Sequence, residues 1–183
     1  MTPNENLIIR QAIKADRSAI KDLWFKVIKS AFNQEHFDDD LTPQKELAFK
    51  MRQLDKAFES PFFTCFLAFE KQTLIGTIAY DKPPNQGILK QTNDALIDMM
   101  ELGSLYIDPD KQKQGYGRAL LKYALESLQK NGIEEICFDS IYEVSQKIWR
   151  AMFGEPIIHK KAPNHSFHHM IWVITVKEAL SRI

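Results

Sequence analysis

Residues 108–121 read DPDKQKQGYGRALL, and their two glycines, Gly115 and Gly117, stand on either side of Tyr116 in a chain that holds only seven glycines. An apolar, strand-like run ends at Ile107, and the apolar spacing of a helix begins after the glycines. Glycine adopts backbone angles closed to other residues, and a helix N-terminus presents free N–H groups that attract anions. The stretch therefore predicts a phosphate-binding turn between a strand and a helix, with a tight, ordinarily capped turn as the alternative.

Three positive side chains, Lys111, Lys113 and Arg118, lie close in sequence to this turn and favour an anionic ligand. Two nucleotide-binding loops compete for the same stretch. A Rossmann loop, GxGxxG, needs glycine where this chain has Leu120, and the approach DPDKQKQ is too long for its tight turn. A Walker loop needs GK followed by Ser or Thr, which this stretch lacks. Asp139 stands at the sequence distance of a ribose-binding acid, so a Rossmann-like site is disfavoured but stays open.

The composition is that of an ordinary soluble domain, with 44% hydrophobic and 26% charged residues. Lys plus Arg and Asp plus Glu number 24 each, so no overall field favours nucleic acid or an anionic membrane. The N-terminus lacks the pattern of a signal peptide, and no segment approaches the ~20 apolar residues of a membrane span. We therefore expect a cytoplasmic protein in which Cys65 and Cys137 are buried thiols, rather than a disulfide.

Hydrophobic periodicity predicts one α+β domain over residues 1–183. Asp16 and the pair Thr42-Pro43 are N-cap signals for the first two helices. Gly103 marks either a bulge or a close approach within the long central strand. In chain order we expect strand 7–13, helix 19–32, helix 43–58, strands 62–70 and 73–81, loop 82–94, strand 95–107, helix 120–128, strand 133–140, helix 144–153, and strands 156–162 and 168–176.

Loop, flanking strand and element order together resemble the GNAT N-acetyltransferase superfamily. The run Gln112-Lys113-Gln114-Gly115-Tyr116-Gly117 matches the family's [Q/R]-x-x-G-x-[G/A] loop. The preceding LYIDPDKQ is similar to the family's strand exit, and GRALLKYAL is similar to its helix. The resemblance implies a mixed, mostly antiparallel central sheet flanked by helices. It covers nearly the whole chain, while the specific motif occupies about residues 101–128.

The resemblance implies acetyl-CoA as the acyl donor. In this family the loop binds the pyrophosphate through backbone N–H groups, and the preceding strand pairs with the pantetheine arm. A bulge in that strand would splay it from the strand at 133–140, and an N–H group in the gap would polarise the thioester carbonyl. The implied cofactor-binding residues are Leu105, Tyr106, Ile107, Gln112, Lys113, Gln114, Gly115, Tyr116, Gly117 and Arg118.

The implied reaction is direct attack by a neutral amine, which needs a base. Glu101 stands on the central strand, where family members often carry a catalytic or substrate-binding carboxylate. We expect it to share a strand face with Ile107, because both positions are odd-numbered. An apolar setting would raise its pKa toward a useful value. The alternative role of Glu101 is that of an acid at a strand edge or in a structural ion pair.

The leaving thiolate benefits from an acid, and here the chain departs from the family pattern. Many members carry a tyrosine four residues before the glycine that ends the helix after the fifth strand. If that glycine is Gly154, the position holds Arg150. Tyr142 and Ser145 are near enough in sequence to substitute, as is a water, although each also fits a surface or capping role. Arg150 or Lys147 would then contact the cofactor instead.

Two polar clusters remain. The histidines near the C-terminus do not predict a metal site, because strand neighbours such as His168 and His169 point to opposite faces. They fit a hairpin with polar tips, in which one histidine could line the substrate mouth; the set is His159, His165, His168 and His169. The acidic run 38–40 fits a solvated loop. In GNAT folds, however, this connector often borders the acceptor site, where an acidic rim would suit a cationic amine.

The expected partner is therefore a small-molecule amine or a peptide amine, with no nucleic acid and no membrane, and a homodimer is compatible with the resemblance. One alternative function is a GNAT-like module that binds acyl-CoA as a sensor without turnover. Arg150 at the usual tyrosine position favours that alternative, and the carboxylate of Glu101 opposes it. The second alternative is the Rossmann-like nucleotide-binding protein considered above.

Overall fold

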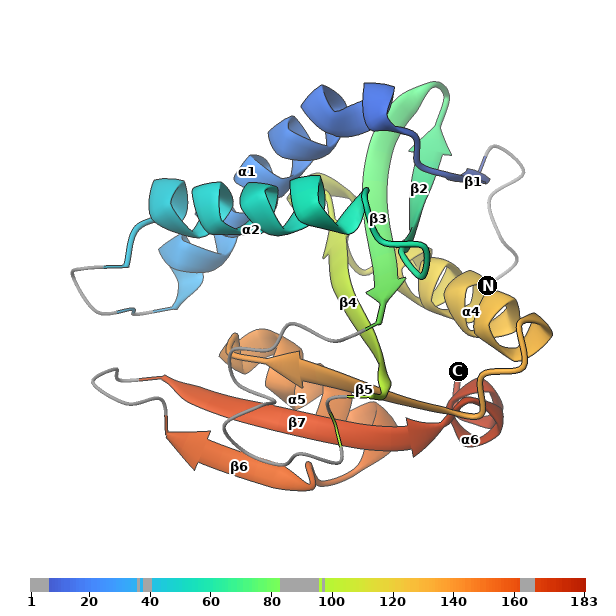
Figure 1. Cartoon of the computed structure of the whole chain (residues 1–183). Helices are drawn as coiled ribbons and strands as arrows, with labels where there is room; N and C mark the ends of the chain where they lie inside the picture. Colours follow the sequence, from blue (N-terminus) through green and yellow to red (C-terminus); the bar gives the residue numbers. More distant parts are fainter. Residues whose placement is uncertain (1–6, 36, 38–40, 83–95, 97, 162–166) are drawn as a thin grey trace.

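The computed structural model describes residues 7–35, 37, 41–82, 96, 98–161 and 167–183. Within them, a seven-stranded sheet has the order β1-β2-β3-β4-β5-β7-β6 (Figure 1). Neighbouring strands run antiparallel, except that β4 and β5 are parallel. The strands are β1 (Leu7–Gln11), β2 (Thr64–Glu70), β3 (Thr73–Asp81), β4 (Met100–Ile107), β5 (Glu135–Ser140), β6 (Ile158–Lys161) and β7 (His168–Thr175). The predicted mixed, mostly antiparallel sheet is confirmed.

Helices cover both faces of this sheet. α1 and α2 lie over one face, and α4, α5 and α6 pack on the other (Figure 1). The helices are α1 (Arg17–Gln34), α2 (Pro43–Ala57), α4 (Tyr116–Lys130), α5 (Glu143–Phe153) and α6 (Val176–Ser181), with short 3-10 turns η1 (Lys14–Asp16) and η3 (Pro109–Lys111). The two faces therefore carry separate hydrophobic clusters.

The helix that follows the glycine turn is anchored by its apolar stripe. Five residues of α4 at helical spacing are almost completely buried against the sheet: Leu120, Leu121, Ala124, Leu125 and Leu128. Burying one such side chain stabilises a fold by roughly 1.5–3 kcal/mol. The start of α4, and with it the glycine turn, is consequently held in a fixed position at the end of β4.

β4 and β5 pair over a short distance and then separate. Their ladder consists of Met100 opposite Ile136 and Glu101 opposite Cys137. Beyond these pairs the two strands diverge, as Figure 1 shows. The predicted splay between the central strand and the strand at 133–140 is confirmed. It leaves a gap in the middle of the sheet.

A bulge on the other side of β4 accompanies this separation. Thr77 of β3 lies opposite Tyr106, whereas Ala79 lies opposite Gly103, so β4 contains one residue more than β3 between the two pairs. Ser104 lies in this bulge with φ of +52°, in the left-handed region that non-glycine residues seldom adopt. Gly103 was expected to mark either a bulge or a close approach. The bulge lies next to it, and the left-handed residue is its neighbour, Ser104.

The extra residue changes which face of the sheet each side chain of β4 occupies. Met100 and Leu102 pack in the cluster on the α4 face, and so does Ile107 beyond the bulge, whereas Tyr106 packs on the face of α1 and α2. Glu101 lies between Met100 and Leu102 and therefore points to the face opposite Ile107. The prediction that Glu101 and Ile107 share a face was wrong, because it assumed an unbroken two-residue alternation.

The predicted element boundaries differ from the structure in a few places. β4 begins at Met100 rather than at residue 95, and residues 83–94 of the predicted loop lie outside the described residues.

The caps of two helices also differ from the prediction. Asp16 makes no cap bond to α1; its carboxylate accepts from the Ile13 N–H at 2.9 Å and binds Arg10 instead. α6 was missed because its short apolar pattern continues that of β7. Its N-cap, Thr175, accepts from the Glu178 N–H at 3.2 Å.

Both cysteines are buried free thiols, as expected. Cys65 and Cys137 are buried and do not bond to each other. Burial raises the pKa of each thiol to about 12, so both stay protonated. In the part of the chain that the structure describes, no helix combines the length and the apolar character needed to cross a bilayer.

Gly76 of β3, rather than Gly103, is the glycine required by close packing. A Cβ at Gly76 would lie 2.6 Å from Ile107 Cδ1 and 2.8 Å from Leu120 Cδ1, whereas a Cβ at Gly103 would meet no described atom within 4 Å other than those of its chain neighbours. We expect Gly76→Ala to lower the free energy of unfolding by about 1–3 kcal/mol through overpacking. Gly103→Ala is the matched control, with a change below about 1 kcal/mol. Urea denaturation measures both, and equal losses would contradict the packing role of Gly76.

Candidate functional site

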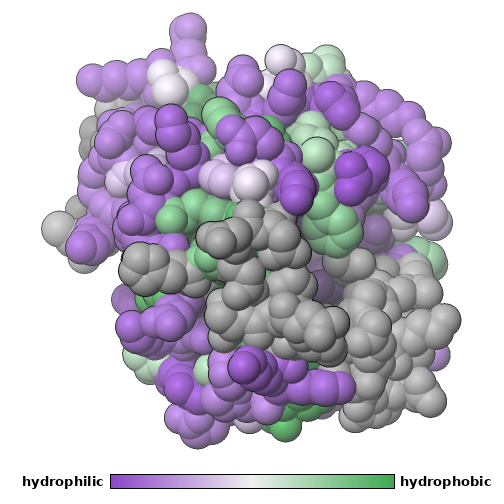
Figure 2. Space-filling model, turned by 90° about the vertical axis from the view of Figure 1, so that its left-hand side faces the viewer, coloured by the Kyte–Doolittle hydropathy of each residue, from purple (hydrophilic) through white to green (hydrophobic). Residues whose placement is uncertain are grey.

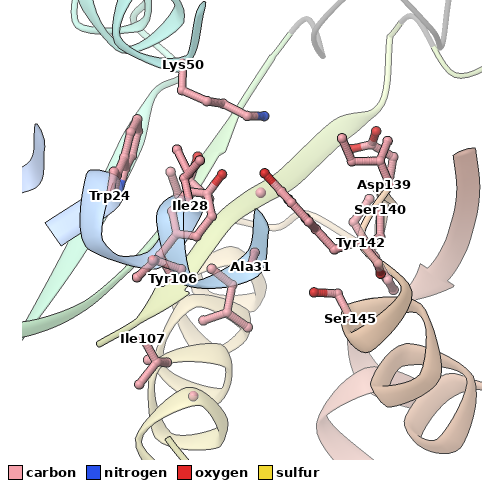
Figure 3. A pocket seen from close by; sticks show the side chains of 18 of the residues that line it. Trp24, Ile28, Ala31, Lys50, Tyr106, Ile107, Asp139, Ser140, Tyr142 and Ser145 are labelled. Carbon is pink, nitrogen blue, oxygen red and sulfur yellow. The ribbon is translucent and has the colours of Figure 1, made fainter. Parts of the chain in front are cut away.

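A cleft of about 1470 Å³ lies where β4 and β5 separate. Its walls come from α1 and α2 on one side and from β4, β5 and the start of α5 on the other (Figure 3). Among the coloured residues in Figure 2, hydrophilic side chains predominate, and hydrophobic residues reach the surface in separate patches between them. The glycine turn lines one end of the cleft, and Glu101, Asp139 and Tyr142 line the other.

The glycine turn has the geometry of an open anion cradle. Gly115 is the N-cap of α4 with φ of +89°, and no described side chain caps the helix there. Lys113 also has a left-handed backbone, with φ of +61°. Apart from its chain neighbours, no described atom lies within 4 Å of a Cβ placed on Gly115, and a Cβ on Gly117 would make an ordinary 3.5 Å contact with Ile107 Cγ1. The first N–H groups of α4 thus face space that an anionic group can occupy.

Side chains of the turn brace it from within. Gln112 Nε2 donates to the Ile107 carbonyl at 3.2 Å, and Gln114 Nε2 donates to the Asp110 carbonyl at 3.2 Å. Such bonds hold the turn in one conformation before any ligand arrives. The predicted role of Gln112 and Gln114 in the cofactor site therefore rests on the shape of the turn and on its backbone groups.

Two residues of the turn bind a carboxylate of β2, although one of them, Lys111, also lines the cleft. Tyr116 is buried and donates its hydroxyl hydrogen bond to Glu70, and Lys111 forms an ion pair with the same carboxylate. Glu70 is thereby the anchor of the turn. Lys113 and Arg118 are exposed at the cleft, and within the described chain neither forms an ion pair. These two side chains supply the positive charge beside the cradle.

Eight of the ten predicted cofactor-binding residues line the cleft: Leu105, Tyr106, Ile107, Gln112, Lys113, Gly115, Gly117 and Arg118. Gln114 and Tyr116 do not line it. The backbone of Leu105, Tyr106 and Ile107 lies on the part of β4 that has separated from β5, since the ladder between these strands ends at Glu101. This edge of β4 is therefore open to a ligand strand in the cleft.

The far end of the cleft is polar and contains a lysine from α2. Lys50 is half-buried, and its amino group points into the cleft (Figure 3). Burial alone lowers the pKa of Lys50, but nearby groups outweigh this effect and the net pKa lies above the ordinary value; these groups are Tyr106, Glu46, Asp139 and Glu101. Burial also raises the pKa of Glu46. Lys50 thus carries a positive charge among several acids.

Tyr142 reaches into the middle of the cleft. It is the N-cap of α5, and its ring extends from the β5–α5 turn across the cleft toward β4 (Figure 3). Its hydroxyl oxygen is buried and makes no hydrogen bond to any described residue. Burial, with smaller effects of Tyr106 and Glu46, raises the pKa of this phenol well above its ordinary value. The Tyr142 hydroxyl is therefore a protonated group available to a ligand.

The other two proton-transfer candidates from the sequence are also at the cleft. Glu101 lines it from β4, next to the point where β4 and β5 part, and Ser145 lines it from the first turn of α5. Arg150, at the position where many family members carry tyrosine, is not among the lining residues and pairs with Glu155 at 3.2 Å. Lys147 likewise pairs with Glu143 within α5, at 3.5 Å.

Sequence reasoning missed the contribution of α2 to the site. Glu46 and Lys50 are one helical turn apart and border the buried stripe of α2, so their helical spacing indicated that both lie at the edge of the core.

One of the four histidines considered from the sequence lies at the cleft. His169 lines it, with Nδ1 3.6 Å from Asp139 Oδ2. The rings of His159 and His168 are 4.8 Å apart. Among described residues, no three His, Cys, Asp or Glu side chains converge on a metal position.

A buried chain of hydrogen bonds holds the bulge of β4 in place. Trp24 Nε1 of α1 donates to Thr77 Oγ1 at 2.9 Å, and the Thr77 hydroxyl donates to the Ser104 carbonyl at 2.9 Å. Thr77 is fully buried. The left-handed backbone of Ser104 is therefore tied to α1 through the interior of the protein, which fixes the shape of the cleft wall.

Comparisons with known proteins agree on one family. The acetyltransferase (GNAT) family model matches residues 24–154. No curated protein matches the chain in sequence.

Solved structures of that kind share the fold. The PaiA N-acetyltransferase of Thermoplasma acidophilum, solved with coenzyme A, is 17% identical, with a TM-score of 0.66 over 91% of this chain and 98% of that chain. The ribosomal-protein-S18-alanine N-acetyltransferase of Escherichia coli is 12% identical, with a TM-score of 0.63 over 93% and 94%. FeeM, an N-acyl amino acid synthase from uncultured soil microbes, is 16% identical, with a TM-score of 0.64 over 96% and 98%.

The hydrogen-bond chain through Thr77 can be tested by substitution. Thr77→Val keeps the volume but leaves the Trp24 N–H and the Ser104 carbonyl without their partner. We expect a loss of about 1–3 kcal/mol in the free energy of unfolding, measured by urea denaturation. Thr77→Ser keeps the hydroxyl and serves as the control, with a smaller loss. If both variants lose the same amount, the methyl group and not the hydroxyl supports the bulge.

Proposed function

Because the chain belongs to the GNAT acetyltransferase family, we propose that it transfers an acetyl group from acetyl-CoA to an amine. The observation that carries this proposal is the cleft. An uncapped helix N-terminus and a strand edge freed by the separation of β4 from β5 line the same continuous space. Proton-transfer groups line that space as well. A donor with a diphosphate, an amide-containing arm and a reactive thioester fits this sequence of features.

The residues present fit such a donor from end to end. The N–H groups at Gly115, Tyr116 and Gly117 would hold the diphosphate, with Lys113 and Arg118 adding charge. The open edge of β4 would pair with the amide groups of the arm, as an added strand does. Bound acetyl-CoA supplies the acyl group on a thioester, with a thiolate as leaving group.

Glu101 and Tyr142 are proposed as the catalytic pair, on opposite sides of the gap between β4 and β5. Glu101 accepts the proton that the attacking amine loses, directly or through a water. The Tyr142 hydroxyl, kept protonated by its burial, gives a proton to the departing sulfur as the carbon–sulfur bond breaks and the carbon–nitrogen bond forms. Ser145 is the second candidate for that proton. In this arrangement Tyr142 or Ser145 supplies the proton, because Arg150, at the position where many family members carry tyrosine, pairs with Glu155 instead.

The acceptor is proposed to be a small-molecule or peptide amine. The related structures named above act, by their names, on ribosomal protein S18 alanine and on amino acids, and both are amines. The acids around Lys50 give the far end of the cleft a negative balance that suits a positively charged acceptor before it loses its proton. The buried free thiols suit a reducing compartment, and we place the activity in the cytoplasm.

A second function, binding of acyl-CoA without turnover, is favoured by one observation. Arg150 stands where many family members have their acid, and it pairs with Glu155 outside the cleft. A thiol-release assay with acetyl-CoA and a panel of primary amines, amino acids and peptides distinguishes the two functions. Tight binding of acetyl-CoA with no thiol release for any amine would establish the sensor and refute the transferase.

The phosphate cradle is tested by Gly117→Glu. The new carboxylate would enter the cradle, and one like-charge contact at 4 Å costs roughly 4 kcal/mol near a protein surface. We expect the affinity for coenzyme A, measured by calorimetry, to fall by about a hundredfold or more. Gln129→Glu adds the same charge at the exposed far end of α4 and should leave the affinity unchanged. Equal affinities of Gly117→Glu and the unmodified protein would refute the assignment of the loop.

The proposed base is tested by Glu101→Gln. The amide cannot accept the proton of the amine, so we expect kcat to fall by about a hundredfold and its pH dependence to flatten. The affinity for coenzyme A should change little, since the proposed diphosphate site is at the other end of the cleft. Glu134→Gln, on the exposed surface before β5, is the control. An unaltered rate and pH profile for Glu101→Gln would show that another group is the base.

A further inference from the structure

The helix that begins beside Tyr142 is capped from the opposite side of the cleft. The N–H groups of Glu143 and Val144, the first two of α5, donate to the two carboxylate oxygens of Glu35 at 2.8 and 3.0 Å. Glu35 is the residue that ends α1, more than 100 positions earlier in the chain. The N-cap residue of α5, Tyr142, makes no cap bond with its own side chain. A carboxylate from α1 therefore takes the place of a local cap.

This contact is favourable on electrostatic grounds. The N-terminus of a helix carries a partial positive charge, and a carboxylate placed there with two N–H donors is stabilised. Glu35 has no lysine or arginine partner within the described chain, so the helix end is its described counter-charge. Glu35 also contributes to the raised pKa of the Tyr142 phenol, after the larger effects of burial, Tyr106 and Glu46.

An aromatic contact strengthens the same link. The ring of Phe37, two residues after Glu35, meets the ring of Tyr142 edge-on at 5.7 Å and stacks on Phe32 at 4.3 Å. Phe37 also contacts Phe167, before β7, at 6.0 Å. The end of α1 thus holds the backbone next to Tyr142 through Glu35 and the Tyr142 ring through Phe37.

The link matters because the sheet does not hold the β5–α5 turn against the α1 side. The ladder between β4 and β5 ends at Glu101 and Cys137, several residues before this turn. Within the described part of the chain, the Tyr142 hydroxyl makes no hydrogen bond that would fix it. Its direction therefore depends on the backbone at the start of α5 and on the packing of its ring.

We propose that Glu35 is a positioning residue: by capping α5 across the cleft, it holds the Tyr142 hydroxyl over β4, where a proton is delivered to the leaving thiolate. This inference rests on the proposed acetyltransferase function. In it, Glu35 affects the proton transfer only through the position of Tyr142. A cap that only stabilises α5 would contribute to folding and leave the proton transfer unchanged.

A double-mutant cycle separates these two roles. Glu35→Gln and Glu35→Ala are made in the unmodified chain and in Tyr142→Phe, and kcat and both KM values are measured with the best amine of the panel. In the unmodified chain we expect each Glu35 change to lower kcat about tenfold, part of the 10²–10⁴-fold that a positioned acid supplies, with KM for acetyl-CoA changed less than about twofold. In Tyr142→Phe the same changes should lower kcat less than about twofold.

Two further measurements complete the test. Thr175→Ala removes the cap of α6, far from the cleft, and should lower the melting temperature while leaving kcat unchanged. Nitration of Tyr142 by tetranitromethane, followed by mass spectrometry, measures how well its ring is shielded from the reagent and requires no enzymatic turnover. We expect faster nitration of Tyr142 in Glu35→Ala.

The outcomes distinguish the inference from the function on which it rests. Equal losses of kcat in both backgrounds, or unchanged nitration of Tyr142 in Glu35→Ala, would overturn the positioning role. Binding of acetyl-CoA without acetylation of any amine would refute the transferase function instead, and the nitration result would still decide whether Glu35 holds Tyr142.

Discussion

The separation of β4 from β5 is the constraint on which the site depends, and a bulge held by a buried polar contact accompanies it on the other side of β4. Trp24, Thr77 and the carbonyl of Ser104 form a hydrogen-bonded chain from α1 through β3 to the bulge. Each of these groups would be costly to bury alone, so the chain keeps the bulge in its left-handed conformation. Without the bulge, β4 would continue the regular alternation of its side chains across the stretch that borders the gap.

The two ends of the cleft are held by different means. The glycine turn is fixed from beneath by the buried stripe of α4 and from the side by Glu70. At the far end, the β5–α5 turn lies beyond the ladder between β4 and β5, and a carboxylate and a phenyl ring from the end of α1 contact it instead. In the proposed transferase, the donor's diphosphate would thus meet a rigid cradle, while the acceptor side would be formed by side chains from several elements.

Much of the fold and one end of the site could be predicted from local sequence. Apolar periodicity located the main strands and helices, and the glycine pair between a strand and a helix marked the turn at Gly115. The contributions of Lys50 and Glu35 depend on contacts between distant segments that no local pattern records. The left-handed conformation of Ser104 escaped prediction because serine carries no preference for such a backbone. The register shift at this bulge also reversed the expected face of Glu101.

The extra residue at the bulge also decides which layer of the molecule receives each later side chain of β4. Tyr106 faces the α1 side while Ile107 supports α4. A strand one residue shorter at this point would exchange these two assignments, so the length of β4 sets both the lining of the cleft and the support of α4.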